Sequence, residues 1–233
     1  MRGKIIVIEG TDCSGKETQT RNLLKKLNDN NILTSYFSYP NYDSPTGKIV
    51  GGPYLGKAEI CKGWFLEKAV NVDPYVSSLF FAADRRYNYK EILKFIDDGV
   101  NVIIDRYVYS NMAHQAGKFE LVDERIKLYD FLDKLEFDLL ELPKPDLLIF
   151  LHMPTEYATI LKKNRLFLDE HEEDENYLKK AEMVYKEIAG RYNFKTIECV
   201  RNKEIRSIES INAELLEYVL LEVACDGTNC TSG

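Results

Sequence analysis

The sequence lacks long hydrophobic runs and an excess of positive charge. A membrane-spanning helix needs about 18 consecutive apolar residues, and no such stretch occurs in the chain. Lys and Arg number 31 against 38 Asp and Glu, which gives a formal net charge of −7. Proteins that bind nucleic acids or anionic membrane surfaces carry a basic face. We therefore expect neither a membrane span nor a nucleic-acid partner.

Cysteine is also scarce, and its pattern excludes two common uses. The five cysteines are an odd number and include no Cys-x-x-Cys pair, the spacing typical of zinc sites. The chain enters its first apolar segment at Ile5, without the length or shape of a signal peptide. These features favour a cytoplasmic protein with reduced thiols and no structural zinc.

What the sequence does contain is an alternation of strand and helix patterns. The length suits one large α/β domain over residues 1–224, followed by a polar tail, 225–233, that we expect to be disordered. Short apolar runs predict strands at Ile5–Ile8, Thr34–Tyr39, Val100–Ile104, Leu147–Leu151 and Thr196–Val200. Amphipathic patterns predict helices at Glu17–Leu27, Tyr75–Ile96, Glu120–Leu135, Tyr177–Ile188 and Ile208–Val223. The alternation predicts a three-layer α/β fold, with a five-stranded parallel sheet flanked by helices.

The segment between the first strand and the first helix has the spacing of a phosphate-binding P-loop. Gly10 and Gly15 are separated by four residues, and Lys16 follows. Glycines let backbone N–H groups converge on a phosphate chain, the helix N-terminus adds the positive end of its dipole, and the lysine adds a charge. The next position is Glu17, where the pattern has Ser or Thr. The sequence therefore predicts a phosphate site in a P-loop NTPase fold.

Two further pairs of residues stand where a parallel sheet places its ligands. Asp105 and Arg106 follow a predicted strand, and ligands bind at the carboxyl ends of such strands. The pair can serve a magnesium ion and a phosphate, or it can be an ordinary surface pair. Phe81 and Arg85 lie one helical turn apart, so they share a face. They can stack on and hydrogen-bond a base, or they can be a core phenylalanine and a solvated arginine.

Taken together, these segments resemble the thymidylate kinase family of P-loop nucleoside monophosphate kinases. The resemblance covers residues 4–215 and is carried by Ile8–Asp12 with Gly15 and Lys16, Tyr39–Tyr42 with Gly47 and Lys48, Leu79–Arg85, Asp105–Gln115, and Leu142–Leu147. It implies in-line transfer of the ATP γ-phosphoryl group to dTMP, giving dTDP and ADP, in dTTP synthesis. It also implies Mg²⁺ as cofactor and a homodimer.

The resemblance assigns roles to individual residues. ATP would bind the loop made of Gly10, Thr11, Asp12, Cys13, Ser14, Gly15, Lys16, Glu17 and Thr18. The acceptor dTMP would contact Asp12, Tyr42, Phe81, Arg85, Arg106, Tyr107, Ser110, His114 and Gln115. Lys16, Arg106, Arg165 and Asp12 would form the catalytic set. Asp105 and Glu17 would serve the metal.

Two departures from the family pattern concern the phosphate-binding end. We expect Glu17 either to reach the metal through water or to point away, with Thr18 supplying the hydroxyl group. Cys13 occupies a loop position where some members carry an arginine. We expect Arg165, in a lid segment over residues 155–176, to supply the missing charge. The alternative is a basic helix end that interacts with its own dipole. The acidic run at 169–175 is typical of a solvated loop or helix start.

Three other departures lie nearer the acceptor. Tyr42 stands where several members carry an arginine on the acceptor phosphate, so we expect weaker hydrogen bonds there. His114 stands where Tyr or Phe is usual, and its smaller ring predicts looser discrimination against ribose. His152 replaces an Asp that is common at that strand end, and we expect it to serve core packing.

Two other functions stay open at this point. The chain can be a kinase of another pyrimidine nucleotide, because one methyl group in an apolar pocket contributes only ~1–3 kcal/mol. It can also be a nucleotide-binding regulatory protein with weak catalysis, because Glu17 and Cys13 depart from the family pattern. A switch GTPase is not expected, since the sequence has no Asn-Lys-x-Asp motif.

Overall fold

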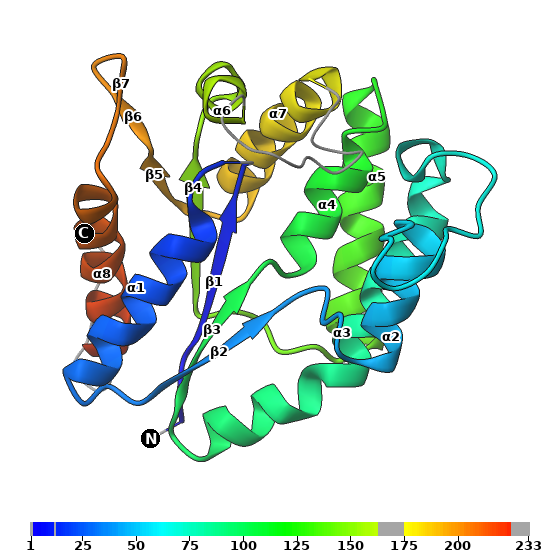
Figure 1. Cartoon of the computed structure of the whole chain (residues 1–233). Helices are drawn as coiled ribbons and strands as arrows, with labels where there is room; N and C mark the ends of the chain where they lie inside the picture. The colour runs from blue at the N-terminus through cyan, green and yellow to red at the C-terminus, as the bar shows by residue number, and fades with distance from the viewer. Residues whose placement is uncertain (1, 12, 163–174, 225–233) are drawn as a thin grey trace.

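A sheet of five parallel strands forms the centre of the molecule. The computed structural model describes residues 2–11, 13–162 and 175–224. The strands follow one another in space in the order β2-β3-β1-β4-β5 (Figure 1). They are β1 Ile5–Gly10, β2 Thr34–Ser38, β3 Asn101–Asp105, β4 Leu147–His152 and β5 Lys195–Glu198. The number of strands and their parallel pairing confirm the predicted fold class.

Helices cover both faces of this sheet. Helices α1 and α8 lie on one face, and α3, α4, α5 and α7 lie on the other (Figure 1). The helices are α1 Lys16–Asp29, α2 Pro45–Ile49, α3 Pro74–Asp97, α4 Val108–Ala116, α5 Val122–Leu132, α6 Thr155–Lys162, α7 Glu175–Arg191 and α8 Ile208–Ala224. Wider π-helical turns follow α2 at Val50–Tyr54 and α5 at Asp133–Leu139, and a 3₁₀ turn spans Ala69–Asn71. The three layers that result are those of a P-loop NTPase.

Side-chain alternation along β1 divides the core into two halves. Ile5 and Val7 belong to the core under α3, α4, α5 and α7. Ile6 and Ile8 belong to the core under α1 and α8. Because successive strand residues point to opposite faces, a strand covered on both sides is apolar throughout. This double burial makes the sheet a fixed platform for the loops at its ends.

Several elements were not predicted from the sequence, among them α4 and a small hairpin. Helix α4 is buried on nearly all sides, so its sequence has no polar face to reveal a helical period. The strand predicted at Thr196–Val200 ends at Glu198, and the chain continues into an antiparallel hairpin of β6 Val200–Arg201 and β7 Glu204–Ile205. Its two turn residues, Asn202 and Lys203, both have positive φ, which is the conformation of a type I′ turn.

The carboxyl ends of β1, β3 and β4 lie at one edge of the sheet, together with the residues that follow them. β1 ends in the glycine loop before α1, β3 ends at Asp105, and β4 ends at His152. Parallel sheets bind ligands at this edge. Among the described helices, none is both long and apolar enough to cross a bilayer.

Candidate active site

The loop between β1 and α1 is wound tightly and is tied to the sheet. Gly15 precedes α1 with φ of 72°, a conformation that suits glycine. A Cβ atom on Gly10 would lie 2.6 Å from the Ser14 hydroxyl oxygen, so this position also needs glycine. The Thr11 hydroxyl donates to the Met153 carbonyl at 2.7 Å and accepts from the Met153 N–H at 2.8 Å. These contacts hold the loop against the end of β4.

Lys16 meets the acidic residue at the end of β3. Its ammonium group forms an ion pair with the Asp105 carboxylate, and both side chains are at least nine-tenths buried. The Tyr36 hydroxyl donates to the other Asp105 oxygen at 3.3 Å. Glu17, by contrast, pairs with Arg21 one turn along α1 at 2.6 Å, and both of these side chains are exposed. The metal role of Glu17 therefore stays a prediction that needs its carboxylate to leave Arg21.

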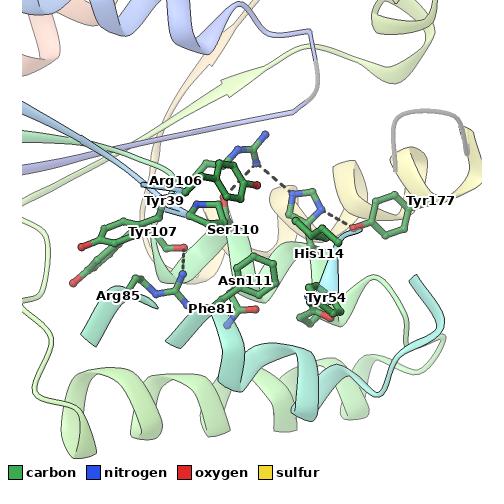
Figure 2. A pocket seen from close by; sticks show the side chains of 14 residues that line it. Tyr39, Tyr54, Phe81, Arg85, Arg106, Tyr107, Ser110, Asn111, His114 and Tyr177 are labelled. Atoms are coloured by element: carbon green, nitrogen blue, oxygen red, sulfur yellow. Dashed lines mark hydrogen bonds between the residues drawn. The ribbon is translucent and has the colours of Figure 1, made fainter. Parts of the chain in front are cut away.

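A cavity of about 190 Å³ lies beside α3 and α4 (Figure 2). Its lining residues are Tyr39, Pro40, Tyr42, Tyr54, Leu55, Phe81, Arg85, Arg106, Tyr107, Ser110, Asn111, His114, Gln115 and Tyr177. Eight of them are the predicted acceptor residues, so the fold brings that whole set together except Asp12. Asp12 and Arg165 lie outside the described residues. The other six lining residues were not predicted from the sequence, and most of them lie in segments without a clear period.

The apolar wall of the cavity is built from α3 and the turn after α2. The Tyr54 ring meets the Phe81 ring edge-on, with centroids 5.7 Å apart and planes at 87°. The Tyr54 hydroxyl donates to the Ala69 carbonyl at 3.1 Å, and the Lys118 ammonium donates to the same oxygen at 3.1 Å. The segment after Tyr54 is thereby held over Phe81. An aromatic face fixed in this way can stack on a planar ligand.

Arg85 is buried and held by a carboxylate that sequence analysis missed. Its Nε and Nη2 atoms both donate to Glu136, the latter at 2.6 Å, and its Nη1 donates to the Tyr107 carbonyl at 3.4 Å. Burial disfavours the charged guanidinium, but Glu136 outweighs that effect and raises the pKa of Arg85. A guanidinium has five N–H groups. One on Nη1 and one on Nη2 are therefore left for a ligand in the cavity.

Two amide side chains of α4 carry buried oxygen atoms that face no donor. Asn111 Oδ1 and Gln115 Oε1 have no hydrogen-bond partner among the described residues, and both residues line the cavity. The Asn111 amide nitrogen is fixed by the Ser78 carbonyl at 3.2 Å and by Glu136 at 3.3 Å. An unpaired buried polar atom costs about 1–3 kcal/mol. The cavity therefore favours a ligand with hydrogen-bond donors at this end.

Arg106 marks the opposite, charged end of the cavity. It follows β3 with φ of 65°, which is unusual for a residue with a side chain and typical of functional sites. Its Nη1 lies 3.4 Å from the Ser110 hydroxyl, 3.3 Å from His114 Nε2 and 3.5 Å from the Tyr185 hydroxyl. Figure 2 shows the guanidinium beside His114. Such a group can bind a phosphate through two parallel hydrogen bonds.

Glu9 fixes α4, the helix that carries four of the lining residues. Its fully buried carboxylate accepts the backbone N–H groups of Tyr107 at 2.8 Å and Ser110 at 3.0 Å, and the Tyr185 hydroxyl at 3.2 Å. A carboxylate at a helix N-terminus satisfies its first N–H groups and complements the dipole. The only sequence signal for this role was an acid at the end of an apolar strand.

Asp84 holds the segment after β2 in place through a similar set of hydrogen bonds. Its buried carboxylate accepts the Asn41 backbone N–H at 2.8 Å, the Ser44 hydroxyl at 3.0 Å and the Thr46 hydroxyl at 2.9 Å. These bonds fix the chain on either side of Tyr42, which lines the cavity. Asp84 belongs to the same sequence segment as Arg85, but its partners could not be identified before the fold was known.

His152 lies in a charged network rather than in plain core packing, which corrects the expectation from the sequence. Its Nε2 is 2.9 Å from Glu182 on α7, and its Nδ1 is 2.6 Å from Glu198 at the end of β5. Because both neighbours are carboxylates, both nitrogens carry protons. Burial disfavours this charge, but the two hydrogen bonds outweigh it and raise the pKa of His152. Glu182 also accepts the N–H and hydroxyl groups of Thr155 at 2.8 and 2.6 Å, which anchors the start of α6.

We expect His152→Gln to lower the free energy of unfolding in a pH-dependent way. The pKa of His152 is higher in the folded protein than in the unfolded chain, where it is about 6.5. The charged His152 therefore contributes its full stabilisation below pH 6.5, and this stabilisation is lost as the pH rises through the folded-state pKa. The loss should be about 2 kcal/mol near pH 6, since a charged hydrogen bond to a mostly buried Glu182 is removed, and smaller near pH 9. Urea unfolding of both proteins at the two pH values measures it.

The matched control for this experiment removes another donor to the same carboxylate. Lys186 lies 2.8 Å from Glu182 but is more than half exposed. Lys186→Gln should cost at most about 0.5 kcal/mol, as exposed pairs one turn apart do. A His152→Gln deficit that is equal at both pH values would contradict a charged imidazole.

Comparisons with known proteins agree with this arrangement. The model of the thymidylate kinase family matches residues 8–209. A thymidylate kinase from Dictyostelium discoideum is 30% identical over 215 residues, which are 92% of this chain and 83% of that protein. One from Schizosaccharomyces pombe is 29% identical over 219 residues, 94% of this chain and 92% of that one. The solved thymidylate kinase from Candida albicans superposes with a TM-score of 0.69 at 25% identity, covering 94% and 92% of the two chains.

The family match and the geometry concern the same residues. The matched range contains the glycine loop, Asp105 and every described residue of the cavity. The match covers most of the chain, and the relatives are covered over most of their own length. On these grounds, the chain belongs to the thymidylate kinase family.

Proposed function

We propose that the cavity beside α3 and α4 holds dTMP and that the loop between β1 and α1 holds the phosphates of ATP. The reaction is that of the family: ATP phosphorylates dTMP to dTDP in dTTP synthesis. The observation that carries the assignment is one cavity with an aromatic face and amide groups at one end and an arginine at the other. A nucleoside monophosphate has the same order of base, sugar and phosphate.

The base end of the cavity suits a pyrimidine. Phe81 would stack on thymine, and the two remaining N–H groups of Arg85 would donate to a thymine carbonyl. Gln115 would add a base contact, as expected from the sequence. Asn111 joins this set, because its unpaired Oδ1 would accept the thymine N3–H. These contacts satisfy polar atoms that are otherwise buried without partners.

The sugar and phosphate would lie toward β3 and the glycine loop. Arg106 would hold the acceptor phosphate, and Tyr42, Tyr107, Ser110, His114 and Asp12 would line its surroundings. Lys16 would neutralise charge on the transferring group. The attacking oxygen belongs to a phosphate that is already charged, so the reaction needs positioning and charge neutralisation more than a general base.

The acidic end of β3 fits a magnesium ion. Asp105 offers hard carboxylate oxygens beside the lysine of the glycine loop, which is the donor chemistry that Mg²⁺ prefers. We propose Asp105 as the residue that serves the metal, with Glu17 joining only if it leaves Arg21. When bound to ATP, Mg²⁺ supplies positive charge that screens the phosphate oxygens.

We also propose Arg165 as the lid cation that replaces the charge missing at Cys13. Arg165→Ala should lower kcat about a hundredfold, or ~2.7 kcal/mol, because one charge on the transferring group is lost. Arg165→Lys retains the charge and should recover most of the rate. Steady-state kinetics at saturating ATP and dTMP measure both variants, and an unchanged kcat in Arg165→Ala would rule the role out.

Further proposals concern the whole molecule. By family analogy the enzyme is a cytoplasmic homodimer without nucleic-acid or membrane partners. We propose that residues 1–224 form a single domain; residues 163–174 of the expected lid segment, 155–176, and the whole of the expected tail, 225–233, lie outside the described residues.

The decisive experiment is a substrate panel read as ADP release. The purified enzyme is given ATP and Mg²⁺ with dTMP, dUMP, dCMP or thymidine. We expect dTMP-dependent turnover, with dUMP slower by about tenfold because one methyl contact contributes ~1–3 kcal/mol. Thymidine should not be phosphorylated, since it brings no phosphate for Arg106. Turnover of dCMP above dTMP would overturn the assignment of the base site.

A further inference from the structure

His114 connects the acceptor arginine to the start of α7. Its Nε2 atom lies 3.3 Å from Arg106 Nη1, and its Nδ1 atom lies 2.8 Å from the Tyr177 hydroxyl oxygen (Figure 2). The His114 and Tyr177 rings are stacked, with centroids 5.9 Å apart and planes at 18°. The three side chains come from the turn after β3, from α4 and from α7. They form one chain of contacts along the edge of the cavity.

The chemistry of the arginine determines which protons the imidazole carries. A guanidinium only donates hydrogen bonds, so His114 Nε2 must accept and cannot carry a proton. The ring is then neutral with its proton on Nδ1, which donates to the Tyr177 oxygen. A second hydrogen bond of this kind is what selects one tautomer over the other. Tyr177 therefore stabilises the form of His114 that can hold Arg106.

Two hydroxyl groups also approach the same nitrogen atom of the guanidinium. Its distances to the Ser110 and Tyr185 hydroxyls, 3.4 and 3.5 Å, are longer than the distance to His114. Both hydroxyl groups are also engaged by the Glu9 carboxylate. A flexible arginine binds phosphate more tightly when it is already held in its bound orientation.

We propose that His114, in the tautomer selected by Tyr177, is a positioning residue that orients Arg106 for the acceptor phosphate. The inference rests on the proposed role of Arg106 in the dTMP site. The groups that face the ring include the Arg106 guanidinium and the phenols of Tyr177 and Tyr185. Burial raises the pKa of Tyr185 well above its ordinary value, so that phenol stays neutral.

Protonation of His114 should weaken acceptor binding. A charged imidazole directs an N–H group at the N–H groups of the guanidinium, so the contact becomes repulsive. The Michaelis constant for dTMP should therefore rise at acid pH, by more than the ionisation of the dTMP phosphate accounts for. That ionisation is the same for every variant, so comparing variants isolates the contribution of His114.

The test compares three variants over the pH range in which imidazole titrates. His114→Leu removes the acceptor and should raise KM for dTMP about tenfold, while KM for ATP stays within about twofold. His114→Gln keeps an acceptor oxygen that does not titrate. It should stay within about threefold of the parent near neutral pH, and it should lose the extra rise at acid pH. Tyr177→Phe keeps the ring but removes the tautomer partner, and it should raise KM about threefold.

A spectroscopic measurement separates this inference from the assignment of the site. The ¹⁵N chemical shifts of the His114 ring in the intact enzyme should report a proton on Nδ1 and none on Nε2, and Tyr177→Phe should mix the tautomers. An unchanged KM for dTMP in His114→Leu, or the parent pH profile in His114→Gln, would overturn the inference while dTMP turnover persists. Absence of dTMP-dependent ADP release in the parent would instead overturn the proposed function. Urea unfolding of His114→Leu checks that the variant is folded.

Discussion

Glu136→Ala should lower the free energy of unfolding by about 3–5 kcal/mol, since it leaves the buried Arg85 charge without its partner. The exposed fractions of the Arg85 and Glu136 side chains are 2% and 0%, so water cannot replace the lost carboxylate. Glu136 also accepts from the Asn111 amide. The change therefore loosens both Arg85 and Asn111, and dTMP binding should weaken together with stability.

The neighbouring Arg86–Glu141 pair is a matched control for this measurement. Its atoms are 3.9 Å apart, and its side chains are 36% and 76% exposed. Glu141→Ala should cost no more than about 0.5 kcal/mol, as expected of an exposed pair. Urea unfolding of the two variants and the parent measures the difference. If the two variants were equally stable, the Arg85–Glu136 pair would not hold the fold as its burial implies.

Glu136→Gln separates the charge from the packing. Glutamine keeps nearly the same volume and one carbonyl oxygen that can accept from Arg85, so it leaves no cavity. Glu136→Gln should therefore lower the free energy of unfolding by about 1–3 kcal/mol less than Glu136→Ala does. The loss that remains in Glu136→Gln should come from the missing negative charge. Equal losses in Gln and Ala variants would assign the effect to charge alone.

Local patterns were enough to predict the platform and much of the site. The apolar runs at Ile5–Ile8 and Val100–Ile104 became neighbouring strands β1 and β3, because strands covered on both faces must be apolar throughout. The glycine spacing and the positions after each strand then located Lys16, Asp105 and Arg106 at one edge. The eight described acceptor residues that the family resemblance implied line one cavity, because three of them follow β2 or β3 and the other five lie on α3 and α4.

Partners that come together only through the fold could not be predicted. Glu136 lies 51 residues from Arg85, in a π-helical turn with no simple period. Glu9 lies in an apolar strand, and its partners Ser110 and Tyr185 come from α4 and α7. His152 was expected to serve core packing, and its partners Glu182 and Glu198 lie 30 and 46 residues away in the sequence. In each case a buried charge is satisfied by long-range contacts that local patterns do not encode.

Arg106→Ala should reduce kcat/KM for dTMP about a thousandfold, or ~4.1 kcal/mol, which we expect to be the largest kinetic effect of a described residue. The guanidinium would bind the acceptor phosphate in the ground state and stabilise charge as the phosphoryl group moves. KM for ATP should change little, because Lys16 and the glycine loop hold its phosphates. Steady-state kinetics with each substrate varied in turn measure the two effects separately.

The backbone at this residue provides a sharper comparison. Because Arg106 has φ of 65°, alanine keeps the strain of a positive φ whereas glycine relieves it. Arg106→Gly should therefore be as inactive as Arg106→Ala but at least as stable. A loss of activity that both variants share would then result from the missing guanidinium and not from a change in the turn. Arg191→Ala, which removes an arginine near the far end of α7 that pairs with Asp130 at 2.6 Å, should leave kinetics unchanged. If Arg106→Gly kept activity within tenfold of the parent, the acceptor phosphate would have to be bound by another cation.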